Sequence, residues 1–268
     1  MSYIVTVFDI RHTIFDIRHL MPSLSIVIPA YNEEPRLAVT LQAIEASLSQ
    51  LKDAGLGLQE VLVCDDGSKD RTVDIAGTFE GRLPVIVHSL PQNRGKGAAV
   101  RMGMLKAVGD FVLMYDADGA TPMSEVPHLF RELQQKHADI AIGSRVSAHT
   151  QSLVTMSWHR RIIGRTYHAL CHTLVPGIHD TACGCKLFTQ VSAKHLFSLQ
   201  KIDRFAFDVE VLSLALIENL KIAEVPVQWT AVPESKVRII RDGLEMFWCV
   251  VRLYVRRVGK GRFALPKD

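Results

Sequence analysis

Two aspartates one residue apart are the strongest chemical signal in this chain. The segment YDADGAT, residues 115–121, places Asp116 and Asp118 directly after the apolar run FVLM. Two carboxylates that share a small volume repel each other unless a cation lies between them. Mg²⁺ or Mn²⁺ suits such a pair, because these ions keep waters and accept phosphate oxygens. The spacing therefore predicts a metal site that also binds a diphosphate, and the alternative is a cap for a helix that begins near Pro122.

The elements that must position this pair alternate short apolar runs with helical stretches. Strands are expected at residues 24–30, 60–66, 85–89, 110–116, 138–144 and 221–229, and helices at 34–51, after Ser68, at 97–108 and from Pro122. Apolar strands separated by helices indicate a parallel sheet that is covered on both faces. The expected fold class is α/β, with a Rossmann-like, mostly parallel sheet in a single domain.

Polar, turn-forming segments follow four successive strands of this expected sheet. They are PAYNEE (29–34), DDGSKD (65–70), PQNRGKG (91–97) and DADGAT (116–121). Each of them alone could be a turn and helix cap, as Asp66-Gly67-Ser68 illustrates. Because ligands bind at the carboxyl ends of the strands in such sheets, four polar segments at one edge favour a binding site.

Composition and charge set the remaining limits. The chain has 268 residues, 48% of them hydrophobic and 22% charged, which favours one large α/β domain over a disordered or fibrous protein. Five cysteines without a secretory leader favour a reducing, cytoplasmic compartment. We expect residues 1–20 to be an extension outside the fold, residues 21–258 to form the domain, and residues 259–268 to be a basic tail. A nucleic-acid partner is not expected.

The glycines around Lys96 match neither of two common nucleotide motifs. The segment NRGKG lacks both the GxxxxGK[ST] spacing of a P-loop and the GxGxxG spacing of a dinucleotide fingerprint. We interpret it as a turn into a helix, with Lys96 supplying positive charge near a nucleotide. The alternative is a lysine that is merely on the surface.

From Leu24 to about Tyr254 the chain resembles the family-2 glycosyltransferases of GT-A fold, on the strength of PAYNEE, DDGS and the DxD. The resemblance implies that Asp118 ligates Mg²⁺ or Mn²⁺, and that Asp116 approaches the ribose or the metal. It also implies that Asp66 accepts from the uracil imide. Three further residues would flank the base, and they are Pro29, Tyr31 and Glu33.

Within that family, further segments resemble the branch that transfers sugars to dolichyl or polyprenyl phosphate. They are QNRGKGAAVRMGM, GSR, DTACGCKLF, FAFDVEVL and ESKV. The mannosyl branch generally has Gln where this chain has Ala120, which favours the glucosyl branch and leaves a third metal ligand open. The expected reaction is inverting transfer of glucose from UDP-glucose. The alternatives are a GDP-mannose-dependent mannosyltransferase, a relative with another acceptor, and a nucleotide-binding scaffold without turnover.

An acceptor phosphate requires positive charge more than it requires a base, because a phosphate monoester is largely dianionic at neutral pH. The candidate residues for that charge are Arg145, Lys186, Lys236 and Arg238. Arg145 and Lys236 are also candidate catalytic residues. Asp208 and Glu210 begin an expected helix. They would orient the sugar or the basic residues, or serve as a base if the acceptor is a hydroxyl.

The carboxyl-terminal stretch GLEMFWCVVRLYVRRV is amphipathic if it is helical. An apolar face would contain Leu244, Phe247, Trp248, Val251, Val255 and Val258. Such a helix either packs on the core as a lid or lies at a membrane interface. Together with the lack of a run long enough to span a bilayer, it predicts a peripheral enzyme at the cytosolic membrane face.

Overall fold

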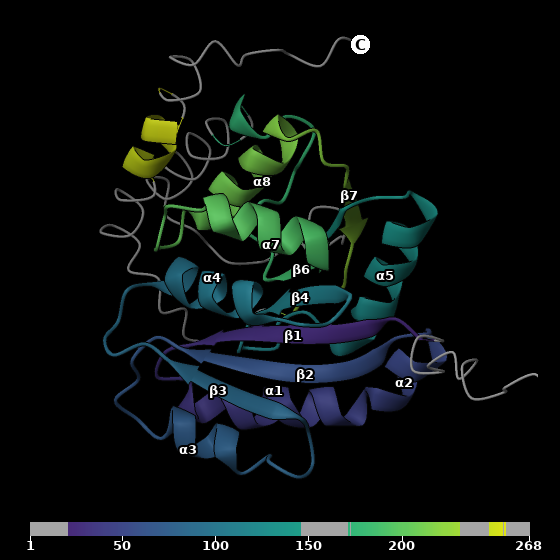
Figure 1. The fold of residues 1–268 in the computed structure, drawn as a ribbon, viewed down its shortest axis with the longest axis vertical. Helices are drawn as coiled ribbons and strands as arrows, with labels where there is room; N and C mark the ends of the chain where they lie inside the picture. The colour runs from purple at the N-terminus through teal and green to yellow at the C-terminus, as the bar shows by residue number, and fades with distance from the viewer. Residues whose placement is uncertain (1–20, 146–170, 172, 231–246, 254, 256–268) are drawn as a thin grey trace, which may run out of the picture.

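The strands form one sheet, and the DADGAT segment (116–121) lies at the end of one of its middle strands. The computed structural model of the protein describes residues 21–145, 171, 173–230, 247–253 and 255. In these ranges a seven-stranded sheet has the order β3-β2-β1-β4-β6-β5-β7 (Figure 1). The strands are β1 (Ser23–Ala30), β2 (Gly57–Asp65), β3 (Val85–Ser89), β4 (Phe111–Tyr115), β5 (Ile140–Ser144), β6 (Cys185–Thr189) and β7 (Ile222–Pro226).

Most neighbouring strands are parallel, as the sequence predicts. The pairs β1–β2, β1–β4, β2–β3 and β5–β7 are parallel, whereas β6 is antiparallel to both β4 and β5. The strand β6 was not expected from the sequence. Because β6 runs in the opposite direction, its beginning lies at the edge where β4 and β5 end, and Cys185 stands opposite Tyr115. The residue before β6 is therefore placed beside Asp116.

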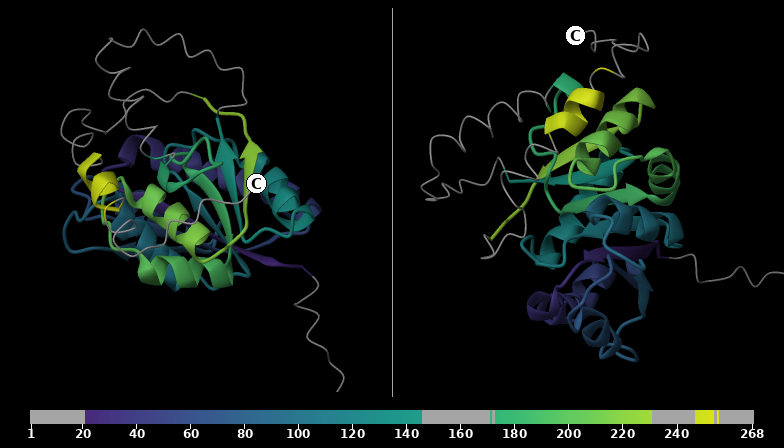
Figure 2. Two further views of the ribbon diagram at one scale, coloured as in Figure 1. Left: turned by 90° about the horizontal axis from the view of Figure 1, so that it is seen from above. Right: turned by 90° about the vertical axis from the view of Figure 1, so that its left-hand side faces the viewer.

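Helices cover both faces of the sheet, which confirms the expected layers. One face is covered by α1 (Glu34–Ala46), α2 (Leu48–Asp53), α3 (Thr72–Gly77) and α5 (Val126–Gln135), and the other by α4 (Lys96–Lys106), α7 (Gln190–Leu199) and α8 (Phe207–Ile217). Figure 2 shows these layers from two further sides.

Two expected helix boundaries were wrong. The helix predicted at residues 34–51 is divided at Ser47, whose hydroxyl donates to the carbonyl of Ala43. Near Pro122 the chain first makes the 3₁₀ turn η3 (Met123–Glu125), and α5 begins only at Val126. The first turn of α5 is therefore separated from the DxD by several residues.

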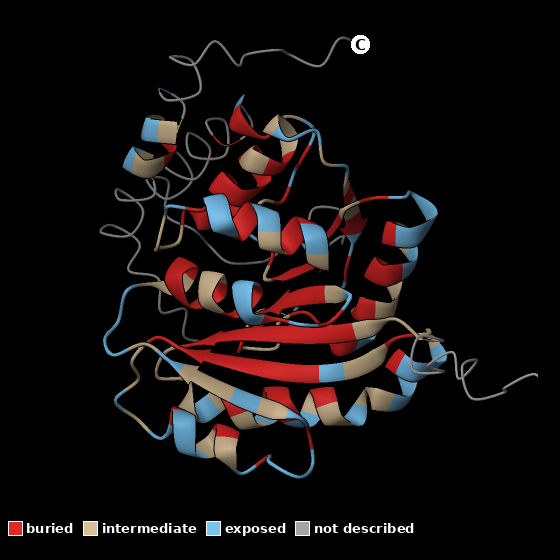
Figure 3. Cartoon of the chain, in the orientation of Figure 1, coloured by how far each residue is buried: buried red, intermediate tan, exposed pale blue. Residues whose placement is uncertain are grey.

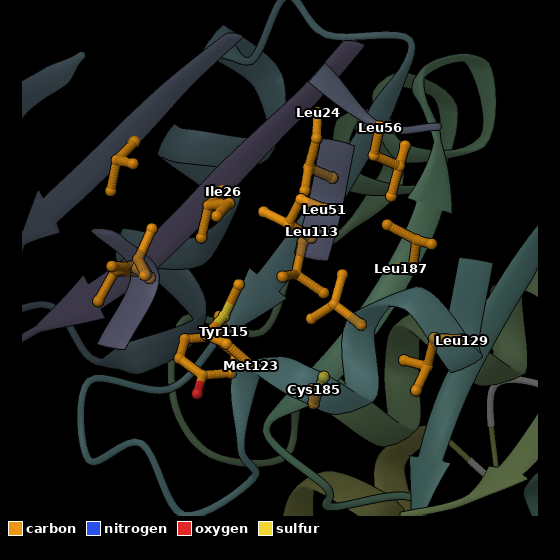
Figure 4. Close-up of a cluster of buried hydrophobic side chains, with 14 of the residues drawn as sticks. Leu24, Ile26, Leu51, Leu56, Leu113, Tyr115, Met123, Leu129, Cys185 and Leu187 are labelled. Carbon is orange, nitrogen blue, oxygen red and sulfur yellow. The ribbon is translucent and has the colours of Figure 1, made fainter. Parts of the chain in front are cut away.

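The core consists of two apolar clusters, one on each face of the sheet. The central strands are almost entirely buried (Figure 3). On one face Leu24, Ile26 and Leu113 pack against the first helical layer, and Cys185 belongs to the same cluster (Figure 4). Such interiors are close-packed, so they leave little freedom to the backbone at the strand ends.

The described residues near the carboxyl terminus correct the expected apolar face. Residues 247–253 are helical, and Val250 is fully buried in the second cluster, with Cys249 and Leu253 packed beside it. Trp248 and Val255 are instead 60% and 61% exposed. Of the predicted apolar face, Phe247 and Val251 are half-buried and Trp248 and Val255 are exposed, so the residues that pack on the core are not the predicted ones. Its members Leu244 and Val258 lie outside the described residues. In the part of the chain that the structure describes, no helix is long and apolar enough to cross a membrane.

A glycine of α4 explains how closely this helix approaches the sheet, and it provides a test of the packing. A methyl group on Gly103 would lie 2.4 Å from Cγ1 of Val27 and 2.5 Å from the sulfur of Cys64. We expect Gly103→Ala to lower the free energy of unfolding by about 1–3 kcal/mol through overpacking, as measured by urea denaturation. The control is Gly77→Ala at the end of α3, where the added methyl meets open space. An unchanged midpoint for Gly103→Ala would contradict this packing.

Candidate active site

Residues from seven segments meet at the edge where the parallel strands end. The loops after β1, β2, β3, β4 and β5 reach this edge, and so do the segments that precede β6 and α8 (Figure 1). The four polar segments singled out in the sequence are therefore brought to one edge, as predicted. Lys236 and Arg238 lie outside the described residues.

The loops after β1 and β2 are interlocked. The backbone N–H of Asn32 donates to Ser68 Oγ, and Asn32 Oδ1 accepts from the N–H of Lys69. The N–H of Glu33 donates to Thr72 Oγ1. These bonds hold the PAYNEE and DDGS segments side by side, where the resemblance places a base-binding site.

The three residues predicted to flank the base differ in how far they are buried. Pro29 is buried in β1, whereas Tyr31 and Glu33 are half-buried beyond its end. The carboxylate of Glu33 is paired with Arg36 at 2.7 Å. Tyr31 and Glu33 thus reach the edge of the sheet, and Pro29 lies beneath it.

Asp66 organises the loop that leads to α4. It is 2% exposed, its Oδ1 accepts from the N–H of Arg94 at 2.7 Å, and its Oδ2 accepts from the N–H of Gly95 at 2.8 Å. Burial raises the pKa of this carboxyl, and the two N–H groups oppose that rise. The structure therefore gives Asp66 a structural task, and its contact with a uracil imide stays a prediction.

The glycines of NRGKG allow close packing against the segment that precedes α8. A methyl group on Gly95, which has a φ of 117°, would lie 2.6 Å from the carbonyl oxygen of Asp203. A methyl group on Gly97 would lie 2.6 Å from the carbonyl oxygen of Ile202. This close approach brings Lys96, at the start of α4, toward the acids of the site.

Lys96 and Asp116 form an ion pair at the centre of the site. Lys96 Nζ lies 2.6 Å from Asp116 Oδ1, and both side chains are partly exposed. Burial tends to lower the pKa of Lys96, but the carboxylates of Asp116, Asp208 and Asp118 outweigh it, so the pKa is raised. Lys96 is therefore protonated at neutral pH, and the interpretation of it as a merely surface lysine was wrong.

Asp118 is held in a turn that is fixed from both sides. Its Oδ1 accepts from the N–H of Ala120 at 3.1 Å, and Gly119 has a φ of 61°. Thr40 Oγ1 donates to the carbonyl of Ala117, and the N–H of Thr230 donates to the carbonyl of Ala120. This turn ends before η3 begins, and α5 begins later still. The helix-cap alternative for the two aspartates is therefore not supported.

The donor set of this turn fits a hard cation with few protein ligands. Two carboxylates, Asp116 and Asp118, lie at the exposed edge, and Lys96 already neutralises one oxygen of Asp116. Among the described residues, no group of three or more His, Cys, Asp or Glu side chains could hold a metal. Mg²⁺ and Mn²⁺ tolerate such a site when waters and phosphate oxygens complete the coordination.

Gly184 makes room for the carboxylate of Asp116. The N–H of Asp116 donates to the carbonyl of Gly184 at 3.0 Å, and a methyl group on Gly184 would lie 2.1 Å from Asp116 Oδ2. Sequence reasoning missed Gly184, although it quoted the segment CGC. The flanking Cys183 and Cys185 point into the apolar core.

We expect Gly184→Ala to displace the Asp116 carboxylate together with its backbone, because the added methyl would also lie 2.8 Å from Cβ of Asp116, a contact that side-chain rotation cannot relieve. Loss of the pairing between Asp116 and Lys96 should reduce catalytic turnover about tenfold or more. The measurement is the turnover rate together with the thermal unfolding midpoint. Wild-type turnover in a folded Gly184→Ala variant would show that the position of Asp116 is unimportant.

Two of the predicted catalytic or acceptor residues lie beneath the site. Lys186 is 2% exposed, and its ammonium donates to the carbonyl of Cys183 at 2.7 Å and to Asp208 Oδ1. Glu210 is 4% exposed, and it accepts from the N–H groups of Lys201 and Ile202. Lys186 is therefore not presented to an acceptor phosphate, and Glu210 anchors the segment that packs on α4. Both predicted roles are unsupported, because burial and pairing commit these side chains elsewhere.

Asp208 joins the buried lysine to the central ion pair. Burial raises its pKa, and the ammonium groups of Lys186 and Lys96 act in the opposite direction. The negative charge of Asp208 also contributes to the raised pKa of Lys96. Asp208 therefore fits the predicted role of orienting a basic residue. Positive and negative groups thus alternate from Lys186 through Asp208 and Lys96 to Asp116.

Arg145 is the predicted acceptor residue that the structure does place at the edge. Its guanidinium pairs with Asp180 through Nε at 2.6 Å and Nη2 at 2.8 Å, and it lies over the ring of Trp229 at 5.6 Å. The pairing with Asp180 raises the pKa of Arg145 further. Sequence reasoning missed Asp180 and Trp229, although Asp180 begins the quoted segment DTACGCKLF.

A mostly parallel α/β sheet with an acidic DxD turn after its central strand defines the GT-A fold class. The family model "Glycosyl transferase family 2" matches residues 25–197, and the chain belongs to this family. The predicted family is confirmed. The fold has relatives among solved structures, although their sequences differ widely.

Curated relatives extend over most of the chain. A dolichyl-phosphate beta-glucosyltransferase of Drosophila melanogaster is 42% identical, covering 90% of this chain and 77% of its own length. The human protein of that name is 40% identical, covering 83% and 72%, and the Saccharomyces cerevisiae protein is 32% identical, covering 83% and 71%. Such identities establish the family on sequence alone.

Solved structures support the fold. Glucosyl-3-phosphoglycerate synthase from Mycobacterium tuberculosis in complex with UDP has a TM-score of 0.62 at 19% identity, covering 86% of this chain and 79% of its own. The same synthase with Mn²⁺, UDP and glucosyl-3-phosphoglycerate has a TM-score of 0.59 at 21% identity, covering 89% and 80%. These similarities confirm the GT-A architecture.

Proposed function

We propose that the protein transfers glucose from UDP-glucose to dolichyl phosphate or another polyprenyl phosphate, with inversion, to give a β-linked lipid phosphate. The observation that carries this proposal is the juxtaposition of the Lys96–Asp116 pair and Asp118 with Arg145 at one edge of the sheet. The names of the curated relatives support glucose as the sugar and dolichyl phosphate as the acceptor.

The donor side would use the acids and Lys96. Asp118 and Asp116 would hold Mg²⁺ or Mn²⁺, which would neutralise the diphosphate of the departing nucleotide. Lys96 adds a protonated ammonium beside them. The uridine would lie over the interlocked loops that contain Tyr31 and Glu33. The solved relatives with UDP, or with Mn²⁺ and UDP-glucose, support this choice of donor and cation.

The acceptor side would use Arg145. A phosphate oxygen of the acceptor attacks the anomeric carbon, and the bond from that carbon to the β-phosphate oxygen of UDP breaks, with its electron pair leaving on UDP. One displacement inverts the anomeric configuration. The acceptor phosphate carries its own negative charge, so the step requires no proton acceptor. Lys236 and Arg238 stay candidates for the positive charge that the acceptor phosphate requires.

We also propose that the enzyme works at the cytosolic face of a membrane, because its acceptor carries a long prenyl chain. The exposed Trp248, Arg252 and Val255 lie at helical spacing on one side of residues 247–253 and 255, and they suit an anionic lipid interface. Flotation with anionic and neutral liposomes tests this association. Recovery of all protein in the unbound fraction with both compositions would refute it.

A donor and acceptor panel tests the reaction itself. UDP-glucose, UDP-galactose, UDP-N-acetylglucosamine and GDP-mannose are each offered with a short polyprenyl phosphate, with Mg²⁺, with Mn²⁺ or with EDTA. We expect transfer from UDP-glucose that disappears with EDTA, and a β-anomeric coupling in the product by NMR. Preference for GDP-mannose would indicate a mannosyltransferase instead, an α-linked product would refute inversion, and no transfer from any donor would favour a scaffold.

A further inference from the structure

The guanidinium of Arg145 is fixed in one plane by Asp180. Nε donates to Oδ2 at 2.6 Å, Nη2 donates to Oδ1 at 2.8 Å, and the backbone N–H of Arg145 donates to Oδ2 at 3.0 Å. Two parallel charge-assisted bonds define both the distance and the orientation of a guanidinium. The side chain of Arg145, which directly follows β5, is thus oriented by a residue from a different part of the chain.

Asp180 is itself held in place by hydrogen bonds to neighbouring residues. Its Oδ1 accepts from the N–H of Ala182, and its own N–H donates to Glu224 Oε1 at 2.9 Å. Glu224, on β7, also accepts from the backbone N–H and from Nδ1 of His179. The backbone around Asp180 is therefore anchored by Glu224, which leaves the carboxylate of Asp180 to bind Arg145.

The two partners differ in exposure. The side chain of Asp180 is 6% exposed and that of Arg145 is 35% exposed. The paired edge of the guanidinium thus faces the interior, and the remaining N–H groups are on the more exposed side, with Trp229 against the face of the plane. The negative charge of Asp116 contributes to the raised pKa of Arg145, so the two side chains belong to the same edge of the sheet.

We propose that Asp180 is a positioning residue, which orients Arg145 so that its outer N–H groups bind the phosphate of the acceptor. This inference rests on the proposed function. Because Asp180 neutralises the charge of Arg145, the contribution of Arg145 is directional hydrogen bonding rather than net positive charge. Loss of Asp180 should therefore weaken the binding of the acceptor and leave the binding of the nucleotide sugar intact.

The variant Asp180→Asn tests this inference in the full-length protein with UDP-glucose, Mn²⁺ and a short polyprenyl phosphate. The amide keeps the size of the side chain but loses the charge and one of the two paired acceptors. We expect the KM for the acceptor phosphate to rise about tenfold, and the KM for UDP-glucose to stay within about twofold of wild type. The matched control is Asp139→Asn, at the opposite end of β5, where the carboxylate accepts from the N–H of Lys221.

The same substitution in an Arg145→Lys protein distinguishes a positioning role of Asp180 from a general loss of structure. Lys at position 145 keeps a positive charge but cannot form the paired bonds, so Asp180→Asn should have little further effect on acceptor KM in an Arg145→Lys protein. Equal changes in both KM values, additive effects of the two substitutions, or an unchanged or lower acceptor KM would each overturn the proposal. Absence of transfer by the wild-type protein would refute the proposed function, and this inference with it.

Discussion

The variant Asp118→Asn is expected to lose about a hundredfold or more of the transfer activity, because in the proposed mechanism a cation that would neutralise the departing diphosphate would lose a charged ligand. The fold should be unaffected. The amide oxygen of Asn can still accept from the N–H of Ala120, so the turn that Asp118 stabilises is retained. The measurement is kcat at saturating donor and acceptor over a series of Mn²⁺ concentrations.

The control for this experiment is Asp74→Asn, which removes an exposed carboxylate from α3. Its activity and thermal unfolding should equal those of wild type. Asp118→Asn should also unfold at the wild-type temperature. Near-normal turnover of folded Asp118→Asn at low Mn²⁺ would remove the metal-binding role from the DxD turn.

The variant Lys96→Met is expected to reduce kcat by about a hundredfold, a loss comparable with that for removing one preorganised group that stabilises developing negative charge. Lys96 lies 2.6 Å from Asp116 and is also close to Asp118 and Asp208 electrostatically. Its removal leaves three carboxylates around the space where a diphosphate would depart. Methionine preserves most of the volume and the apolar contacts of the lysine side chain.

The matched control is Lys136→Met, which breaks an exposed pair with Glu132 at 2.9 Å. Exposed ion pairs contribute about 0–1 kcal/mol to stability, so this control should retain both fold and activity. Lys96→Met should also bind UDP more weakly by isothermal titration calorimetry. If it turned over normally while remaining folded, the ammonium would have no part in the departure of the nucleotide.

The sequence predicted the overall layers because each parallel strand is a continuous apolar run that ends in turn-forming polar residues. It also predicted the site edge, since the carboxyl ends of parallel strands must lie together. The strand β6 escaped prediction because the lysine in CKLFT interrupts its apolar pattern, and its pairing partners β4 and β5 are distant in the chain.

The role of Lys186 could not be inferred from its type. A lysine in a site-like segment is usually exposed, whereas this one faces Asp208 inside the fold. The burial of Glu210 could not be predicted either, because only the folded chain brings the N–H groups of residues 201 and 202 to its carboxylate. Gly184 gave a weak signal, since a glycine between two apolar cysteines marks a backbone that approaches another group closely.

The most direct measurement is the affinity for Mn²⁺, monitored by electron paramagnetic resonance. It is made with and without UDP, in the wild-type protein and in Asp118→Asn. If Asp116 and Asp118 hold a cation against the diphosphate, UDP should strengthen Mn²⁺ binding by the wild-type protein, and this effect should be lost in Asp118→Asn. Equal strengthening by UDP in both proteins would place the cation and the diphosphate elsewhere, and would contradict the proposed site.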